Sequence, residues 1–289
     1  MKKLLVLVCM VVSGVATFSQ SSNKLIFPKG QKLEMVAQTK AVVTQEVMGQ
    51  SMEVNINSTI NRSFDIEDVK SGTATIEHKV KRVQFDFDAM GQKQAFDSEK
   101  EEDMKGDMGK SMEKSIKNKY TLTVDATGNI INVKADDDNM NKTAEKSTDM
   151  MGNMMAQFAE GLEMPKTGDI FPLQVKAQGN LAKGQTWSDS LKGAEVGAIT
   201  YTVNNVTTSD ILIDYTSEGS AKKKQDVGNG MTMDIDIKNK MTGKITLDKK
   251  TGLMKQKTVE SNGTGTMEVM GQIIPMKTKM SGTITVSGL

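Results

Sequence analysis

The stretch LEMVAQTKAVVTQEVMGQSMEVNINSTINRSFDI, residues 33–66, decides the fold. Apolar or small residues occupy most alternate positions of its first part, residues 33–47. After the turn-like Met-Gly-Gln-Ser at 48–51, the alternation resumes in a new phase over residues 52–66. Alternation with a period of two on both sides of a glycine turn predicts an antiparallel β-hairpin.

Segments of this kind recur along the chain, and they are unusually long. Several approach about fourteen residues, which is about 45 Å at about 3.3 Å per residue. Strands this long cannot stay flat, because their twist accumulates and the sheet coils. One face of each segment is polar and the other apolar, as in an antiparallel sheet with one wet side. The sequence therefore predicts a mainly β fold of long, curled antiparallel sheets that resembles a half-barrel.

The strand after the turn at 71–72 changes its phase midway. Its apolar residues fall on even positions up to Val80 and on odd positions from Val83 onward. One extra residue in a strand causes such a change, so we expect a β-bulge near Lys81 and Arg82. Further strands are expected at 120–124, 129–133, 199–203, 211–215, 231–241, 244–247, 254–259, 264–269, 274–280 and 283–286.

Short motifs of the first half return in the second. Lys-Gly-Gln occurs at 29–31 and again at 183–185, and the turn sequence at 123–128 resembles that at 246–252. Met-Gly-Gln occurs at 48–50, 90–92 and 270–272. Such echoes suggest two related halves, although their order is not fully colinear.

One amphipathic helix is expected between the halves, over residues 141–162. Acidic residues at 136–138 suit a helix N-terminus, and Gly161 and Pro165 are typical stop signals. Its apolar face is rich in methionine, and we expect the ligand-binding residues there: Met151, Met154, Met155 and Phe158. Residues 98–119 also space methionines four apart, which fits either a short helix or a mobile loop.

The first nineteen residues have the three parts of an export signal. Lys2 and Lys3 precede an apolar run at 4–12, and small polar residues follow up to Ser19. That run is too short to span a bilayer, so cleavage near Ser19 and an exported location, periplasm or cell surface, are expected. The predicted organisation is a signal peptide (1–19), an N-terminal β half (20–140), the helix (141–162), a connection (163–180) and a C-terminal β half (181–289).

Composition excludes several classes of function. The formal net charge of +1 argues against nucleic-acid binding, which depends on basic surface. The basic run at 222–224 is expected at a solvated hairpin end. The single cysteine lies in the export signal, so the mature chain is expected to lack disulfides and thiolate metal sites. The 23 methionines are expected mainly to fill the core, where flexible side chains suit irregular gaps.

No group of residues predicts catalysis, a metal ion or a cofactor. His78 is the only histidine, so the familiar nucleophile–base triads cannot be assembled in their usual form. It shares the parity of Ile76, which favours a core or strand-edge position. Trp187 is expected to be a buried anchor. The sequence therefore favours a non-enzymatic protein.

The chain resembles one family of exported Bacteroidota proteins that is known only as a domain of unknown function of about 300 residues. The similarity rests on Phe-Pro-Lys-Gly-Gln at 27–31, the Met-Gly-Gln turns, Phe-Asp-Ser at 96–98 and the segment at 184–189. The architecture is also similar to that of periplasmic half-barrel lipoprotein carriers. That similarity is one of fold and implies no catalytic residues.

Two functions of different kinds follow from these features. In the first, the curled sheet binds an apolar ligand, a lipid or acyl chain, or an apolar peptide, with the 141–162 helix as a plug or lid. In the second, the chain is a structural or interaction protein whose own helix fills the sheet and leaves no cavity. The sequence leaves the choice between them open.

Overall fold

The computed structural model describes residues 24–47, 49–89, 91–117, 119–135, 165–177, 181–191, 195–228, 231–269 and 271–289. The predicted export signal (1–19), the predicted 141–162 helix and its residues Met151, Met154, Met155 and Phe158 lie outside this part of the chain. In the described part, no helix is both long enough and apolar enough to cross a membrane.

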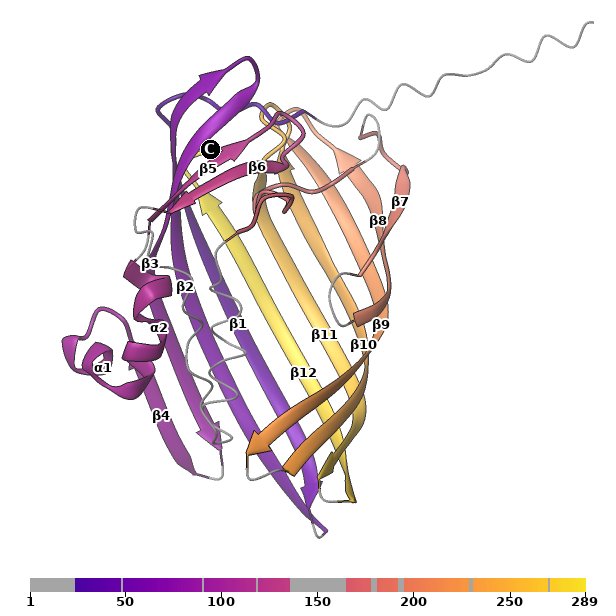
Figure 1. Ribbon diagram of the computed structural model, residues 1–289. Coiled ribbons are helices and arrows are strands. Elements are labelled where there is room, and N and C mark those ends of the chain that lie inside the picture. Colours follow the sequence, from indigo (N-terminus) through magenta and orange to yellow (C-terminus); the bar gives the residue numbers. More distant parts are fainter. Residues whose placement is uncertain are drawn as a thin grey trace, which may run out of the picture.

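The described residues form one twelve-stranded antiparallel sheet that curls into a half-barrel (Figure 1). The strands are β1 (Lys32–Val47), β2 (Gln50–Lys70), β3 (Thr73–Ala89), β4 (Gln92–Asp97), β5 (Lys119–Val124), β6 (Ile130–Ala135), β7 (Thr186–Ser190), β8 (Glu195–Val206), β9 (Asp210–Gly228), β10 (Met231–Asp248), β11 (Met254–Val269) and β12 (Gln272–Ser287). Their order is β6-β5-β3-β2-β1-β12-β11-β10-β9-β8-β7, with β4 paired to β3 beside β5. The expectation of a mainly β, curled antiparallel fold is confirmed.

The predicted hairpin turns are also confirmed. Gly49, Gly91 and Gly271 all have positive φ angles near 80°, and they connect β1 to β2, β3 to β4 and β11 to β12. Glycine suits these positions because it has no Cβ to oppose a left-handed backbone. The same three-residue motif therefore makes the same turn each time.

The predicted bulge in β3 lies where the phase change places it. Asn61 pairs with Arg82 and Arg62 pairs with Val80, so Lys81 is left over between them. Because one extra residue is accommodated there, Val80 and Val83 keep their side chains on the same face of the sheet.

The strands β8 to β12 of the second half are longer than the sequence indicates, and three of them each join two predicted segments. The predicted segments 231–241 and 244–247 are one strand, β10, and the segments 254–259 and 264–269 are likewise joined in β11. In the same way β12 joins 274–280 to 283–286. Glycine or serine between these segments does not end the strands, because the residues there remain paired with both neighbours.

Two of the sequence echoes occupy related places. Gly30 and Gly184 both have positive φ, and their amides donate 2.8 Å hydrogen bonds to the carbonyl oxygens of Ile66 and Val203. β1 and β7 therefore begin in the same way, each beside the strand that follows it. The similar turns at 125–129 and 248–252 follow β5 and β10. Both pairs of strands are six places apart in the strand order, which supports two related halves.

A large hydrophobic cluster closes one end of the half-barrel. It joins strands from both sides of the sheet, including Ile76 of β3 and Val203 of β8. Phe171 and Leu173, from the predicted connection, are fully buried in it. The connection thus contributes to the core as well as linking the halves.

A second cluster lies over the other end of β2, β3 and β4. Here α1 (Glu101–Lys105) and α2 (Asp107–Lys117) cover the strands, and Met112 of α2 is completely buried. It packs with Val83, Phe85 and Phe87. The helical interpretation of residues 98–119 is therefore confirmed, and the interpretation as a mobile loop is wrong.

The opposite face of the sheet is polar and carries surface ion pairs. Lys222 and Lys224 pair with Asp236 and Asp234 at distances of 3.0 and 3.7 Å. The basic run therefore lies within β9 and faces a neighbouring strand, instead of forming the hairpin end that the sequence indicates. Exposed pairs of this kind contribute little to stability.

The candidate ligand-binding face

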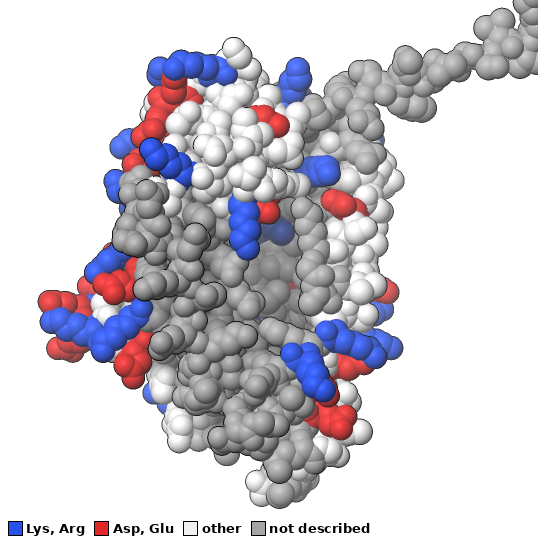
Figure 2. Space-filling view, in the orientation of Figure 1, with Lys and Arg blue, Asp and Glu red and all other residues white. Residues whose placement is uncertain are grey.

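Residues directly opposite each other in paired strands share one face of the sheet. A single row runs from Val83 of β3 to Val203 of β8 and passes through Ile60, Ala37, Ile284, Lys257, Ile245 and Ile213. The first cluster joins residues from both ends of such rows, so this face is the concave one. We call it the inner face. Figure 2 looks toward the hollow that it surrounds and shows basic atoms inside it.

Part of the inner face belongs to neither hydrophobic cluster of the described residues. In β10 and β12 it presents Ile237, Met241, Met276 and Met280, all partly buried. Between them, β11 contributes Ser261, Gly263 and Gly265. We call these seven residues the open floor. The side chains of Asn239 and Thr278 lie over Gly263, and the methionines supply a flexible apolar lining.

A stack of aromatic side chains separates the open floor from the closed end. The rings of Trp187 and Tyr201 lie 5.0 Å apart, and those of Tyr201 and Tyr215 lie 6.0 Å apart. Trp187 is buried and its indole N–H donates to the Lys176 carbonyl oxygen at 2.9 Å, so the expectation of a buried anchor is confirmed.

Tyr215 lies across Gly243 and reaches the next strand. Its hydroxyl donates a 2.9 Å hydrogen bond to the carbonyl oxygen of Thr258. A Cβ atom on Gly243 would lie only 2.5 Å from the Tyr215 ring and 2.1 Å from that oxygen. Only glycine at position 243 leaves space for the Tyr215 ring. Burial, with a smaller effect of Tyr201, raises the pKa of Tyr215 to about 12, so its hydroxyl is a donor at neutral pH.

Lys257 points into the hollow beside this ring. It lies between Ile245 and Ile284 in the inner row, and its Nζ is 5.2 Å from the centre of the Tyr215 ring. Burial lowers the pKa of the Lys257 ammonium. Within the described part of the chain, no carboxylate forms an ion pair with it. The ring face offers a cation some compensation, but less than a carboxylate would.

Arg62 is a second inward-facing cation, on β2 between Met35 and Val80. Burial lowers the pKa of its guanidinium. His78 lies near it, stacked between Phe64 and Tyr120, with ring centroids 4.8 and 6.0 Å away. His78 is therefore a core histidine, as expected, and burial together with Arg62 lowers its pKa to about 4.

The described inner positions of β1–β3 and β9–β12 carry basic residues but no acidic ones. Across β1, β2, β3, β9, β10, β11 and β12, the inner positions that the structure describes include Arg62, Lys257 and, by register, Lys223 opposite Ile235, but no Asp or Glu. The acids of these strands point outward, as do Asp86 and Asp88 of β3. The hollow is therefore both apolar and positive.

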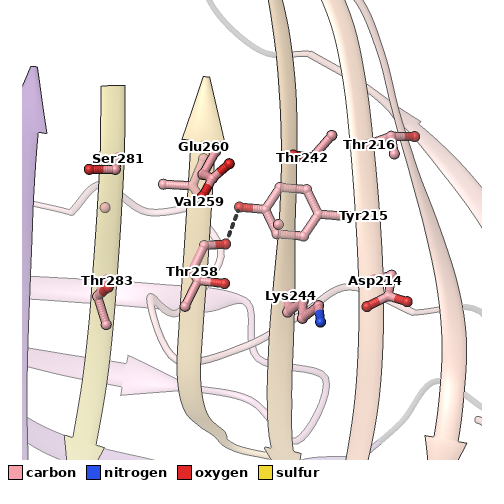
Figure 3. Close-up of a pocket in the computed structure, with 12 residues that line it drawn as sticks. Asp214, Tyr215, Thr216, Thr242, Lys244, Thr258, Val259, Glu260, Ser281 and Thr283 are labelled. Carbon is pink, nitrogen blue, oxygen red and sulfur yellow. Dashed lines mark hydrogen bonds between the residues drawn. The ribbon is translucent and has the colours of Figure 1, made fainter. Parts of the chain in front are cut away.

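The outer face carries a separate, shallow depression of about 500 Å³ over β9–β12 (Figure 3). Alternation places its rim side chains on the face opposite Tyr215: Asp214, Thr216, Thr242, Lys244, Thr258, Glu260, Ser281 and Thr283. Hydroxyls and mixed charges dominate this rim. It offers an apolar molecule no enclosure.

No group of three or more His, Asp and Glu is placed to hold a metal ion within the described ranges. The sequence reasoning also missed Lys257 and Arg62, although a signal was available. Arg62 falls between Ile60 and Phe64 in the phase of the apolar residues, and Lys257 shares its phase with Val259. A charged residue on an apolar parity is the pattern that could have identified both.

Comparisons with known proteins establish a family but no activity. No curated protein sequence matches the chain. Two solved structures can be aligned with most of this chain. One, a structure of lipid–protein interactions in lipovitellin, matches with a TM-score of 0.49 and 10% identity over 91% of this chain. The chain spans only 26% of the length of that protein.

The other structure is an outer-membrane channel from Pseudomonas putida F1. It matches with a TM-score of 0.26 and 6% identity, over 92% of this chain and 98% of the channel. Neither similarity is close enough to assign a ligand. A family model described as "Family of unknown function (DUF6263)" matches residues 71–254. The chain belongs to this family of unknown function.

Proposed function

We propose that this protein is exported and non-enzymatic, and that it binds a lipid or acyl chain on the inner face of its curled sheet. The observation that carries the proposal is the open floor, where Met241, Met276 and Met280 face the hollow outside both hydrophobic clusters. Apolar side chains gain free energy when they leave water, and an apolar ligand would provide that burial.

The backbone of this region favours a lipid over a peptide. The residues of β10, β11 and β12 are paired with strands on both sides, so the floor presents side chains and few free backbone groups. A peptide brings amides and carbonyls that need hydrogen-bond partners when they are buried. An acyl chain needs none, and each methylene buried contributes about 0.8 kcal/mol.

Export is supported by the sequence pattern at residues 1–19. A non-enzymatic role is supported by the single histidine, with which the familiar nucleophile–base triads cannot be assembled in their usual form. The rival function is a structural protein whose own 141–162 segment covers the floor. Deleting residues 141–162 distinguishes the two. If the segment is a lid, the sheet stays folded and binds more apolar dye. If it is part of the core, the protein unfolds.

Two neighbouring substitutions test the proposed binding face. Met280 faces the hollow, whereas the next residue, Ser281, faces outward and is exposed. We expect Met280→Glu to weaken binding of the neutral dye N-phenylnaphthylamine at least tenfold, because the ligand would have to desolvate a carboxylate. Ser281→Glu adds the same charge on the other face and should leave dye binding unchanged.

Native mass spectrometry of the purified chain provides the second readout. We expect a bound species with the mass of a lipid, which organic solvent removes. Equal dye binding by both Glu variants, together with an unliganded mass only, would contradict the proposed function.

A further inference from the structure

We propose that the ligand is a long-chain fatty acid whose carboxylate pairs with the Lys257 ammonium while its tail lies on the open floor. This inference rests on the proposed function and specifies its ligand. Four observations support it: the charge of the hollow, the surroundings of Lys257, the distance along β11 and the single charge that Lys257 offers.

The charge of the inner face calls for an anion. Lys257 points inward, and no acidic residue shares the inner positions of β1–β3 and β9–β12 that the structure describes. Buried charges are ordinarily paired, because an isolated ion loses its hydration without compensation. A hollow that needed only to hold a neutral oil would gain nothing from this cation.

Lys257 is the better placed cation for the headgroup. It lies between Ile245 and Ile284, where an apolar side chain would pack well, so the position is costly for an ammonium. The Tyr215 ring, 5.2 Å from Nζ, holds one side of the ammonium. No carboxylate among the described residues pairs with the ammonium, so a ligand carboxylate can be its partner, and burial of that pair would strengthen it.

The distance along β11 suits one acyl tail. From Lys257 to Gly265 there are eight residues, which is about 26 Å of extended strand. The hydrocarbon core of a bilayer is about 30 Å thick, so a tail from one leaflet covers about 15 Å. A tail anchored at Lys257 therefore ends within the open floor, beside Met241 and Met280.

The headgroup that pairs with Lys257 is monovalent. Lys257 is the inner cation of β11, Arg62 lies one row higher and three strands away, and the register places Lys223 of β9 opposite Ile235, beyond the other end of the floor. One carboxylate balances one ammonium. A phospholipid would bring a second tail and a larger headgroup to the same place, which makes a free fatty acid the better match.

Equilibrium dialysis of the delipidated full chain tests this assignment with two probes, oleate and oleyl alcohol, which share one tail. We expect the wild-type protein to bind oleate about tenfold more tightly than the alcohol. Lys257→Met should remove that preference without changing the affinity for the alcohol, because it keeps an apolar stem and deletes the charge. Lys257→Arg should retain the preference.

Lys244→Met is the matched control. Lys244 lies on β10 next to the same site but on the outer face, and it is exposed. We expect this variant to bind both probes like the wild type. If Lys257→Met fails to fold, the wild-type ratio and the Lys257→Arg variant still decide the question.

The outcomes separate this inference from the proposed function. If the wild type binds both probes equally, or Lys257→Met keeps the preference for oleate, the headgroup assignment is wrong and the apolar site stands. Binding of phosphatidylglycerol vesicle lipid without oleate binding also overturns it. If neither oleate nor the alcohol binds, both proposals fail.

Discussion

The two halves of the inner face share the same alternation of apolar and polar residues, but they differ in how tightly their side chains are packed. In the first half, β1, β2 and β3 contain no glycine, and Phe64, Phe85 and Phe87 are buried. In the second half, the inner positions include Gly243, Gly263, Gly265 and Gly282. Met241, Met276 and Met280 near them are only partly buried, although Met267 is buried. The size of the side chains at the inner positions therefore decides whether a curled sheet forms a solid core or lines a hollow.

Truncating one side chain from each region should show the largest contrast. Phe85→Ala removes a ring from the second cluster, so we expect a loss of about 3–5 kcal/mol in the free energy of unfolding. Met280→Ala removes a side chain that borders the hollow and should cost about 1 kcal/mol or less. Urea denaturation measures both. Equal losses would mean that the floor is as tightly packed as the first half.

Filling a glycine position of the second half should also be destabilising. In Gly243→Ala the new methyl would lie 2.1 Å from the Thr258 carbonyl oxygen, so strand spacing must change. We expect a loss of about 3 kcal/mol, the upper part of the range for overpacking. The control is Gly106→Ala, whose methyl would meet its nearest atom at 3.3 Å. Thermal unfolding that ranks the two variants the other way would contradict this geometry.

The filled half should carry a pH dependence between about pH 6.5 and 4, because it contains the only histidine of the chain. The pKa of His78 is lowered from 6.5 to about 4. As the pH falls from about 6.5 to about 4, the unfolded chain binds a proton that the folded chain does not, so stability is lost in that window. The full loss is on the order of 3 kcal/mol.

His78→Leu tests the origin of this acid sensitivity. Neither ring nitrogen of His78 has a hydrogen-bond partner among the described residues, so leucine should be tolerated at pH 7. Between pH 6.5 and pH 4, the leucine variant should lose about 3 kcal/mol less than the wild type. An unchanged pH profile would assign the effect to other groups.

The effects of removing the two turn aspartates should be similar in the two halves. Asp125 accepts hydrogen bonds from the Thr127 amide and hydroxyl, and Asp248 accepts the same pair from Thr251, at 2.7–2.8 Å. Burial works to raise the pKa of each aspartate, but these hydrogen bonds outweigh it and the net shift is downward. We expect Asp125→Ala and Asp248→Ala each to cost about 1–2 kcal/mol in chemical denaturation. Markedly unequal costs would argue against equivalent turns.

Much of this fold could be predicted from the sequence, because its alternation is long and regular. The bulge at Lys81 follows from a change of phase within one strand, and the Met-Gly-Gln turns follow from glycine at a position that requires positive φ. These are local signals that tertiary packing does not override.

The sequence did not predict that β10, β11 and β12 are each one uninterrupted strand. Glycine in a sequence usually marks a turn, yet Gly243, Gly263 and Gly282 lie within strands. Gly243 has this role because Tyr215 of a neighbouring strand lies over it, and only the register reveals that contact. The expected site residues, Met151, Met154, Met155 and Phe158, stay predictions.

The most direct test of the proposed function is to locate the ligand. A long-chain fatty acid with a photoreactive diazirine in its tail can be crosslinked to the delipidated protein and mapped by peptide mass spectrometry. We expect adducts on inner-face residues of β10–β12, with Met241 and Met280 foremost, and competition by unlabelled oleate. Adducts confined to the outer face, or spread over the surface without competition, would contradict binding in the hollow.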